Sequence, residues 1–175
     1  MSGPLPAAPM LGALAAHSLA RVQVTTIEGG GGPVRGTVRR VLRLDGHAVP
    51  VEVSVGDDAV ELRLPDELDA VRCELAIACV REWLDLDLEP GAVELALGAD
   101  PRLGPLLARR PGLRIVGHPD PFEAAITTVI GQRVSLAAGR VFGTRLVDLF
   151  APTGDLVEFP GPETVAAADP AAVQR

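Results

Sequence analysis

Few segments of this 175-residue sequence place reactive side chains in a pattern that could perform chemistry. The stretch Leu84 to Glu89 gathers three carboxylates, as a hydrolytic site does. Its strict period of two instead predicts a strand with these acids on one solvated face. The three histidines, His17, His47 and His118, lie in separate segments and lack the spacing of metal ligands, so the sequence predicts no metal site.

The most informative pattern is a short polar turn, Gln132-Arg133-Val134, between two apolar segments. Asp120-Pro121-Phe122-Glu123 predicts a helix start with an N-cap, a first-turn proline and a capping-box acid, and this helix runs to Gly131. Ser135 is the predicted N-cap of a second helix that continues to about Phe150. The turn would therefore join two helices by a tight connection.

The elements that position this turn follow from hydrophobic periodicity. Four runs rich in Val, Ile, Leu and Thr, separated by glycine and aspartate turns, predict an antiparallel meander. After Pro65 the period becomes helical, and this helix, ending near Trp83, is expected to cover the apolar side of the sheet. Further short helices are expected at 101–110 and 161–168. The runs span approximately 21–28, 34–44, 48–55 and 59–64.

Composition and charge limit the class of protein. With 47% hydrophobic and 22% charged residues the chain should fold. We expect a cytoplasmic protein, because no signal peptide and no 18-residue apolar stretch occur, and we predict no membrane contact. Cys73 and Cys79 are expected to stay unpaired. Residues 1–100 carry a net charge of −8 and residues 101–175 a net charge of +1, which leaves the second part as the candidate for contact with nucleic acid.

The last residues contain the signals of a helix start but too few residues to form the helix. Asp169-Pro170 is an N-cap followed by a first-turn proline, yet the sequence ends at Arg175. A helix this short cannot hold itself together, so we expect the chain to be a piece of a longer protein.

Residues 109–150 resemble the entry into the glycosylase domain of the DNA-3-methyladenine glycosylase II family, which belongs to the helix-hairpin-helix glycosylases. This resemblance lies in three segments that occur in the same order. The apolar stretch Met10 to Ala16 and the meander also resemble that family's N-terminal domain. The sheet of that domain is similar to the sheet of the TATA-binding protein. It implies an α+β fold: an N-terminal α+β domain over 1–100 and an incomplete all-α glycosylase domain over 101–175. The three segments are Arg110-Pro111-Gly112-Leu113-Arg114, Asp120-Pro121-Phe122-Glu123 and Gly131-Gln132-Arg133-Val134-Ser135.

The resemblance implies a base-excision repair activity: hydrolysis of the N-glycosidic bond of an alkylated base that has been flipped out of double-stranded DNA. The segment Gln132, Arg133, Val134 and Ser135 resembles the family's DNA wedge, with Arg133 at the tip and Gln132 facing the extruded base or its orphaned partner. Ser135 is either a plain helix cap or a phosphate contact. Ala13 and His17 fall where the family's N-terminal domain borders the base pocket, and the aromatic residue expected at Ala13 is missing.

The family's hairpin motif and its catalytic aspartate do not occur in these 175 residues, so no catalytic residue is assigned and the chain alone is expected to be inactive. No small-molecule cofactor is implied. The residues leave two alternatives open, a non-catalytic DNA- or protein-binding module and an unrelated α+β protein.

Overall fold

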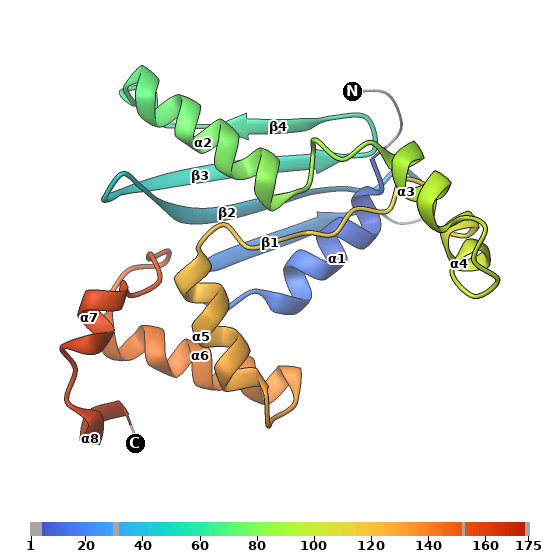
Figure 1. The fold of residues 1–175 in the computed structure, drawn as a ribbon. Coiled ribbons are helices and arrows are strands. Elements are labelled where there is room, and N and C mark those ends of the chain that lie inside the picture. The colour runs from blue at the N-terminus through green and yellow to red at the C-terminus, as the bar shows by residue number, and fades with distance from the viewer. Residues whose placement is uncertain (1–4, 30–31, 152, 174–175) are drawn as a thin grey trace.

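A four-stranded antiparallel sheet forms the centre of the first half of the molecule (Figure 1). The computed structural model describes residues 5–29, 32–151 and 153–173. The strands pair in chain order, β1-β2-β3-β4, which confirms the predicted meander. Asp45 and Gly46 close the central hairpin with φ of 48° and 73°, as a tight two-residue turn requires. The strands are β1 (Gln23–Glu28), β2 (Arg35–Leu44), β3 (His47–Gly56) and β4 (Val60–Arg63).

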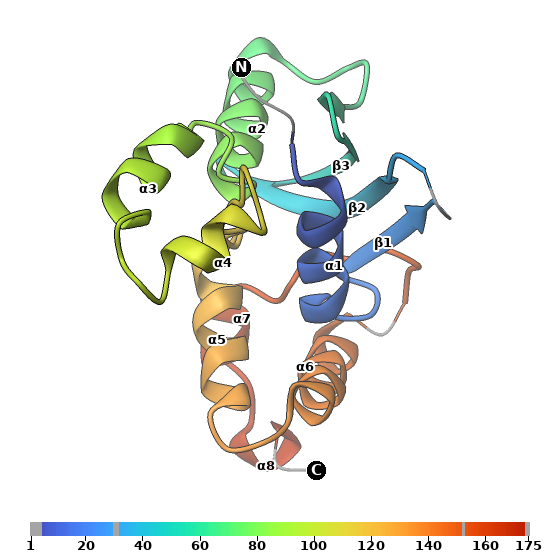
Figure 2. The same cartoon turned by 90° about the vertical axis from the view of Figure 1, so that its right-hand side faces the viewer.

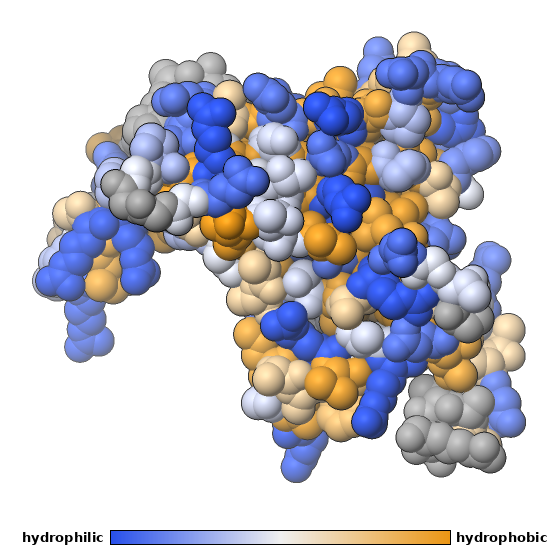
Figure 3. Space-filling view, turned by 180° about the vertical axis from the view of Figure 1, so that it is seen from behind, coloured by the Kyte–Doolittle hydropathy of each residue, from blue (hydrophilic) through white to orange (hydrophobic). Residues whose placement is uncertain are grey.

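Two helices, α1 (Ala7–His17) and α2 (Ala70–Trp83), cover one face of this sheet, and the predicted helix is therefore confirmed (Figure 1). Their buried side chains pack on alternate residues of β2 and β3 in one core cluster. Gly36 allows close contact, because a Cβ there would lie 2.5 Å from Thr26 O and 2.7 Å from the Leu11 side chain. The opposite face, seen from behind in Figure 3, carries hydrophilic and hydrophobic side chains side by side.

The second half is helical, and Figure 2 shows α5 (Pro121–Gly131) and α6 (Leu136–Phe150) side by side below α1, joined by a turn at their lower ends. A second core cluster of Leu19, Val22, Val147 and Phe159 fixes α6 to the segment after α1. The expected boundary near residue 100 stays a prediction. The other helices are α3 (Pro90–Leu97), α4 (Gly104–Ala108), α7 (Pro162–Ala166) and α8 (Pro170–Val173).

The strand predicted over Leu84 to Glu89 is wrong, because these residues form a turn that closes the end of α2. The N–H of Leu86 donates to Arg81 O at 2.8 Å, and the buried Leu84 and Leu86 side chains join the sheet core. Arg114 donates to the carbonyl oxygens of Asp85 and, at 3.0 Å, Leu88. The alternation of leucine and acid therefore reflects two anchoring leucines in a turn and not a strand face.

Two further predictions concerned the cysteines and membrane-spanning segments. Cys73 and Cys79 are both free, as predicted. Within residues 5–29, 32–151 and 153–173, no helix is long and apolar enough to cross a membrane.

Candidate functional site

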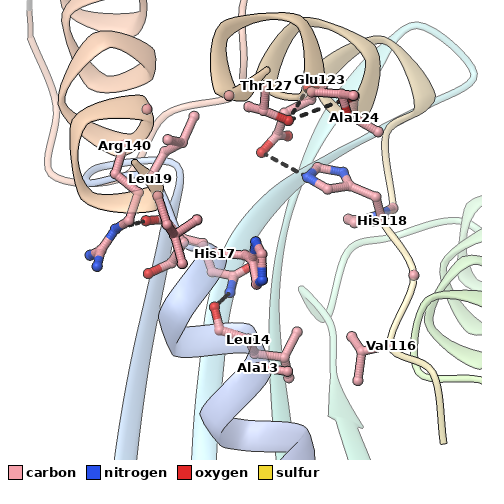
Figure 4. A pocket seen from close by; sticks show the side chains of 18 of the residues that line it. Ala13, Leu14, His17, Leu19, Val116, His118, Glu123, Ala124, Thr127 and Arg140 are labelled. Carbon is pink, nitrogen blue, oxygen red and sulfur yellow. Dashed lines mark hydrogen bonds and ion pairs between the residues drawn. The ribbon is translucent and has the colours of Figure 1, made fainter. Parts of the chain in front are cut away.

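A cavity of about 670 Å³ lies where the two halves of the molecule meet (Figure 4). One wall is the C-terminal end of α1, and the facing wall is formed by α5 and the start of α6. The segment 116–119 and Trp83, at the end of α2, complete it. Many of the lining residues are small, which keeps the cavity wide between these elements.

The two residues predicted to border a pocket line this cavity, together with one residue of the predicted wedge turn. Ala13 and His17 lie on its α1 wall, and Gln132 lies on the opposite wall at the end of α5. The three are exposed at the rim. Residues separated by more than a hundred positions in sequence are thus brought to one site, and their role in binding stays a prediction.

The remaining predicted residues, Arg133, Val134 and Ser135, continue from Gln132 into the exposed turn between α5 and α6. Ser135 is the N-cap of α6, since its hydroxyl accepts from the N–H of Ala138 at 3.2 Å. The expected cap is confirmed. The turn is exposed at the lower ends of α5 and α6 in Figure 2, and it adjoins the cavity through Gln132.

A buried charged cluster that sequence reasoning missed forms one end of the cavity. Arg40 is 2% exposed, and its guanidinium donates to Glu123 Oε2 at 2.7 Å and to Gln23 Oε1 at 3.2 Å. The same guanidinium lies over the ring of Trp83, 5.4 Å from the centroid. One side chain from β2 thus contacts residues of β1, α2 and α5.

His118 extends this cluster toward the solvent. Its Nε2 lies 3.5 Å from Glu123 Oε1, and its side chain is 29% exposed (Figure 4). Partial burial lowers the pKa of His118 below its ordinary 6.5, and the nearby Glu123 carboxylate opposes that shift. The ring is therefore neutral at physiological pH.

The predicted capping-box role of Glu123 is wrong. Asp120 caps α5 through its own carboxylate, which accepts from the N–H of Phe122 at 2.8 Å and of Glu123 at 3.2 Å. The Glu123 side chain instead turns inward, where Arg40 provides a full charge partner. A signal for this existed in the sequence: Arg40 occupies the row of β2 that otherwise carries core residues such as Val38 and Leu42.

The arrangement can enclose a small molecule between α1 and the α5–α6 pair and offer it hydrogen-bonding groups at one end. Glu123 is the one carboxylate among the described residues that line the cavity. Its charge is compensated by Arg40, so it is poorly suited to stabilise a developing cation. Nowhere in the described part of the chain do three or more His, Cys, Asp or Glu residues gather as a metal site.

A known structure shares this fold. The 3-methyladenine DNA-glycosylase from Archaeoglobus fulgidus superposes with a TM-score of 0.78 at 18% sequence identity, over 99% of this chain and 59% of that one. The meander with two covering helices and the following helix pair thus share the fold of the superposed part of that glycosylase structure.

The chain belongs to the AlkA N-terminal domain family, whose model matches residues 1–120. DNA-3-methyladenine glycosylase 2 of Escherichia coli is 32% identical over 94% of this chain. The probable bifunctional transcriptional activator/DNA repair enzyme AlkA of Mycobacterium tuberculosis is 34% identical over 90% of it. The chain spans 55% of the first relative and 39% of the second. The resemblance inferred from the motifs is confirmed.

Proposed function

We propose that this chain forms the DNA-engaging front part of a glycosylase that removes alkylated bases from double-stranded DNA. The observation that carries the proposal is the position of the turn Gln132 to Ser135, which is exposed and directly adjacent to a cavity of about 670 Å³. An enzyme that hydrolyses the bond between base and sugar must extrude the nucleotide and hold it in a pocket. A protruding tip and a neighbouring hollow supply these two needs.

Arg133 is the proposed wedge residue at the tip. Its planar guanidinium can stack on the bases that flank the gap or contact the orphaned partner base. Gln132 reaches both the turn and the cavity, so it is placed to contact the extruded base. Ala13 and His17 form the opposite border of the pocket.

Bond cleavage is assigned to a part of the enzyme outside the matched region. Glu123, the carboxylate of the described cavity wall, is held by Arg40 at 2.7 Å, and it lacks the free charge needed to stabilise an oxocarbenium-like transition state. The match covers 55% of the Escherichia coli relative, and we propose that the part of the enzyme outside the match supplies this carboxylate. Such an enzyme would act on the genome in the cytoplasm.

The proposal is tested by measuring the affinity of this chain for a duplex that contains an abasic-site analogue and for the same duplex without it. We expect tighter binding to the damaged duplex. Arg133→Ala should lower the affinity for that duplex about tenfold, because a stacking contact contributes roughly 1–3 kcal/mol. The matched control is Arg145→Ala, an exposed arginine on α6 outside the turn. Equal affinity for both duplexes, unaffected by Arg133→Ala, would contradict the proposal.

A further inference from the structure

Three side chains form the polar end of the cavity, and the fold of this chain holds all three in place. Arg40 extends from β2, Glu123 from the first turn of α5, and His118 from the segment 116–119. Arg40 and Glu123 are 2% and 3% exposed, and the Arg40 guanidinium rests on the Trp83 ring, 5.4 Å from its centroid. The sheet and α2 therefore fix where the Glu123 carboxylate points.

The two oxygens of the Glu123 carboxylate have different surroundings. Oε2 accepts from Arg40 at 2.7 Å. Oε1 has His118 Nε2 at 3.5 Å, which lies beyond the roughly 2.7–3.2 Å of an ordinary N–H···O hydrogen bond. A buried carboxylate oxygen without a short hydrogen bond is costly, and a donor supplied by a ligand removes this cost. Oε1 is therefore the acceptor that this end of the cavity offers to a bound molecule.

The ring of His118 supplies a donor beside this acceptor. The backbone N–H of Asp120 points at Nδ1 from 3.5 Å, and Nε2 faces Glu123 Oε1 at the same distance. A proton on Nδ1 would oppose the Asp120 N–H, whereas a proton on Nε2 is attracted by the carboxylate, so the neutral ring carries its proton on Nε2. Because partial burial lowers the pKa of His118, this neutral form is present at physiological pH.

This donor and this acceptor lie together on one side of the cavity, where they match the edge of a nucleobase. Figure 4 shows His118 and Glu123 at one end, with His17 across the cavity. Enzymes that flip a base read it by hydrogen bonds to its Watson–Crick edge, on which an N–H donor stands next to an oxygen or nitrogen acceptor. A base with this edge toward α5 can donate to Oε1 and accept from Nε2–H at the same time.

We infer that Glu123 Oε1 and His118 Nε2 together bind the Watson–Crick edge of the extruded base and set its orientation in the cavity. The inference rests on the proposed function and adds the residues that contact the base on this side. The base donates its N–H to Oε1, and Nε2–H donates to the neighbouring acceptor of the base. Arg40 is a positioning residue that acts through Glu123, because its guanidinium is occupied by Glu123 and Gln23.

The test compares two neutral nucleosides that differ only at this edge: inosine, which carries N1–H beside O6, and 1-methylinosine, in which a methyl group replaces that hydrogen. Trp83 is the single tryptophan of the chain, so its one indole N–H signal in NMR spectra reports binding beside the cavity, with calorimetry as a second measurement. We expect the Kd of inosine to be lower by about tenfold, because 1-methylinosine lacks one hydrogen bond to a charged group.

Variants of His118 test the second hydrogen bond. His118→Leu removes the donor and should raise the Kd of inosine by about fivefold. His118→Gln retains a side-chain N–H and should recover part of this loss, which a purely structural role of the ring does not predict. The matched control is His47→Leu, at an exposed histidine outside the cavity lining, which should leave the Kd of both nucleosides unchanged.

Three results overturn the inference: equal Kd values for the two nucleosides, no response of the Trp83 signal or the calorimeter to either one, or an unchanged Kd of inosine in His118→Leu. A chain that recognises the abasic duplex through Arg133 yet gives one of these results retains the proposed function and loses only this contact with the base.

Discussion

The guanidinium of Arg40 and the carboxylate of Glu123 form an ion pair of 2.7 Å in which both side chains are almost fully buried, at 3% and 4% exposed. The pair ties the second strand of the sheet to the helix that leads into the exposed turn. Because Arg40 also contacts Gln23 and Trp83, it joins α5 to both β1 and α2, in addition to the packing of Phe122 and Ile126 on the second core cluster. The cavity and the proposed wedge therefore share a common support.

Removing one partner of this pair should destabilise the protein strongly. Arg40→Met leaves the Glu123 carboxylate buried without its partner, at an expected cost of about 3–5 kcal/mol in the free energy of unfolding. The double variant Arg40→Met/Glu123→Leu should be more stable than Arg40→Met alone, because no uncompensated charge remains. Urea unfolding of the parent chain, both single variants and the double variant measures this coupling. Strictly additive losses would show that the two residues do not support each other.

His118 should make stability depend on pH near neutrality. Partial burial lowers its pKa in the folded state below the ordinary 6.5, so the unfolded state binds the proton first as the pH falls. The stabilisation is present above pH 6.5, decreases as the pH falls through that value, and levels off below the folded-state pKa. His118→Gln should flatten this part of the stability curve measured by urea unfolding.

The control for this experiment is His47→Gln, at an exposed position in the β2–β3 hairpin. His118 is intact in that variant, so the slope assigned to His118 should remain. A slope that survives His118→Gln unchanged would assign the titration to another group.

Two glycines, Gly36 on β2 and Gly12 on α1, should respond oppositely to alanine. In Gly36→Ala the new Cβ would lie 2.5 Å from Thr26 O and 2.7 Å from the Leu11 side chain, so overpacking should cost about 1–3 kcal/mol or more. In Gly12→Ala, within α1, the Cβ meets nothing within 4 Å, and better helix propensity should add up to about 1 kcal/mol. Thermal unfolding of both variants checks the pair, and a stable Gly36→Ala protein would mean that α1 does not rest on β2.

The sequence predicted the local structure well wherever one residue type has one strong preference. Asp45-Gly46 defined the central hairpin, and Asp120 and Ser135 defined the starts of α5 and α6. The alternation at Leu84 to Glu89 led to a wrong prediction of a strand. A period of two in hydrophobicity cannot distinguish a strand from a turn whose leucine side chains pack into the core of the sheet.

The charged end of the cavity could not be predicted from local patterns. Glu123 has the position of a capping-box acid, and only the tertiary fold brings Arg40, 83 residues away, within 2.7 Å of it. An arginine in the core-facing row of β2 indicated a buried partner without identifying it. The lining positions Ala13 and His17 were proposed as pocket residues, and Gln132 as part of the wedge turn, only through the family resemblance, since nothing in their own sequence context places α1 beside α5.

The most direct test of the account is whether the turn unstacks DNA bases. A duplex with 2-aminopurine beside an abasic-site analogue becomes more fluorescent when that base loses its stacking partner. We expect saturating amounts of this chain to raise the fluorescence, Arg133→Ala to abolish most of the rise, and Arg145→Ala to preserve it. A full rise with Arg133→Ala, or no rise when the parent chain is bound, would contradict the assignment of the turn as the wedge.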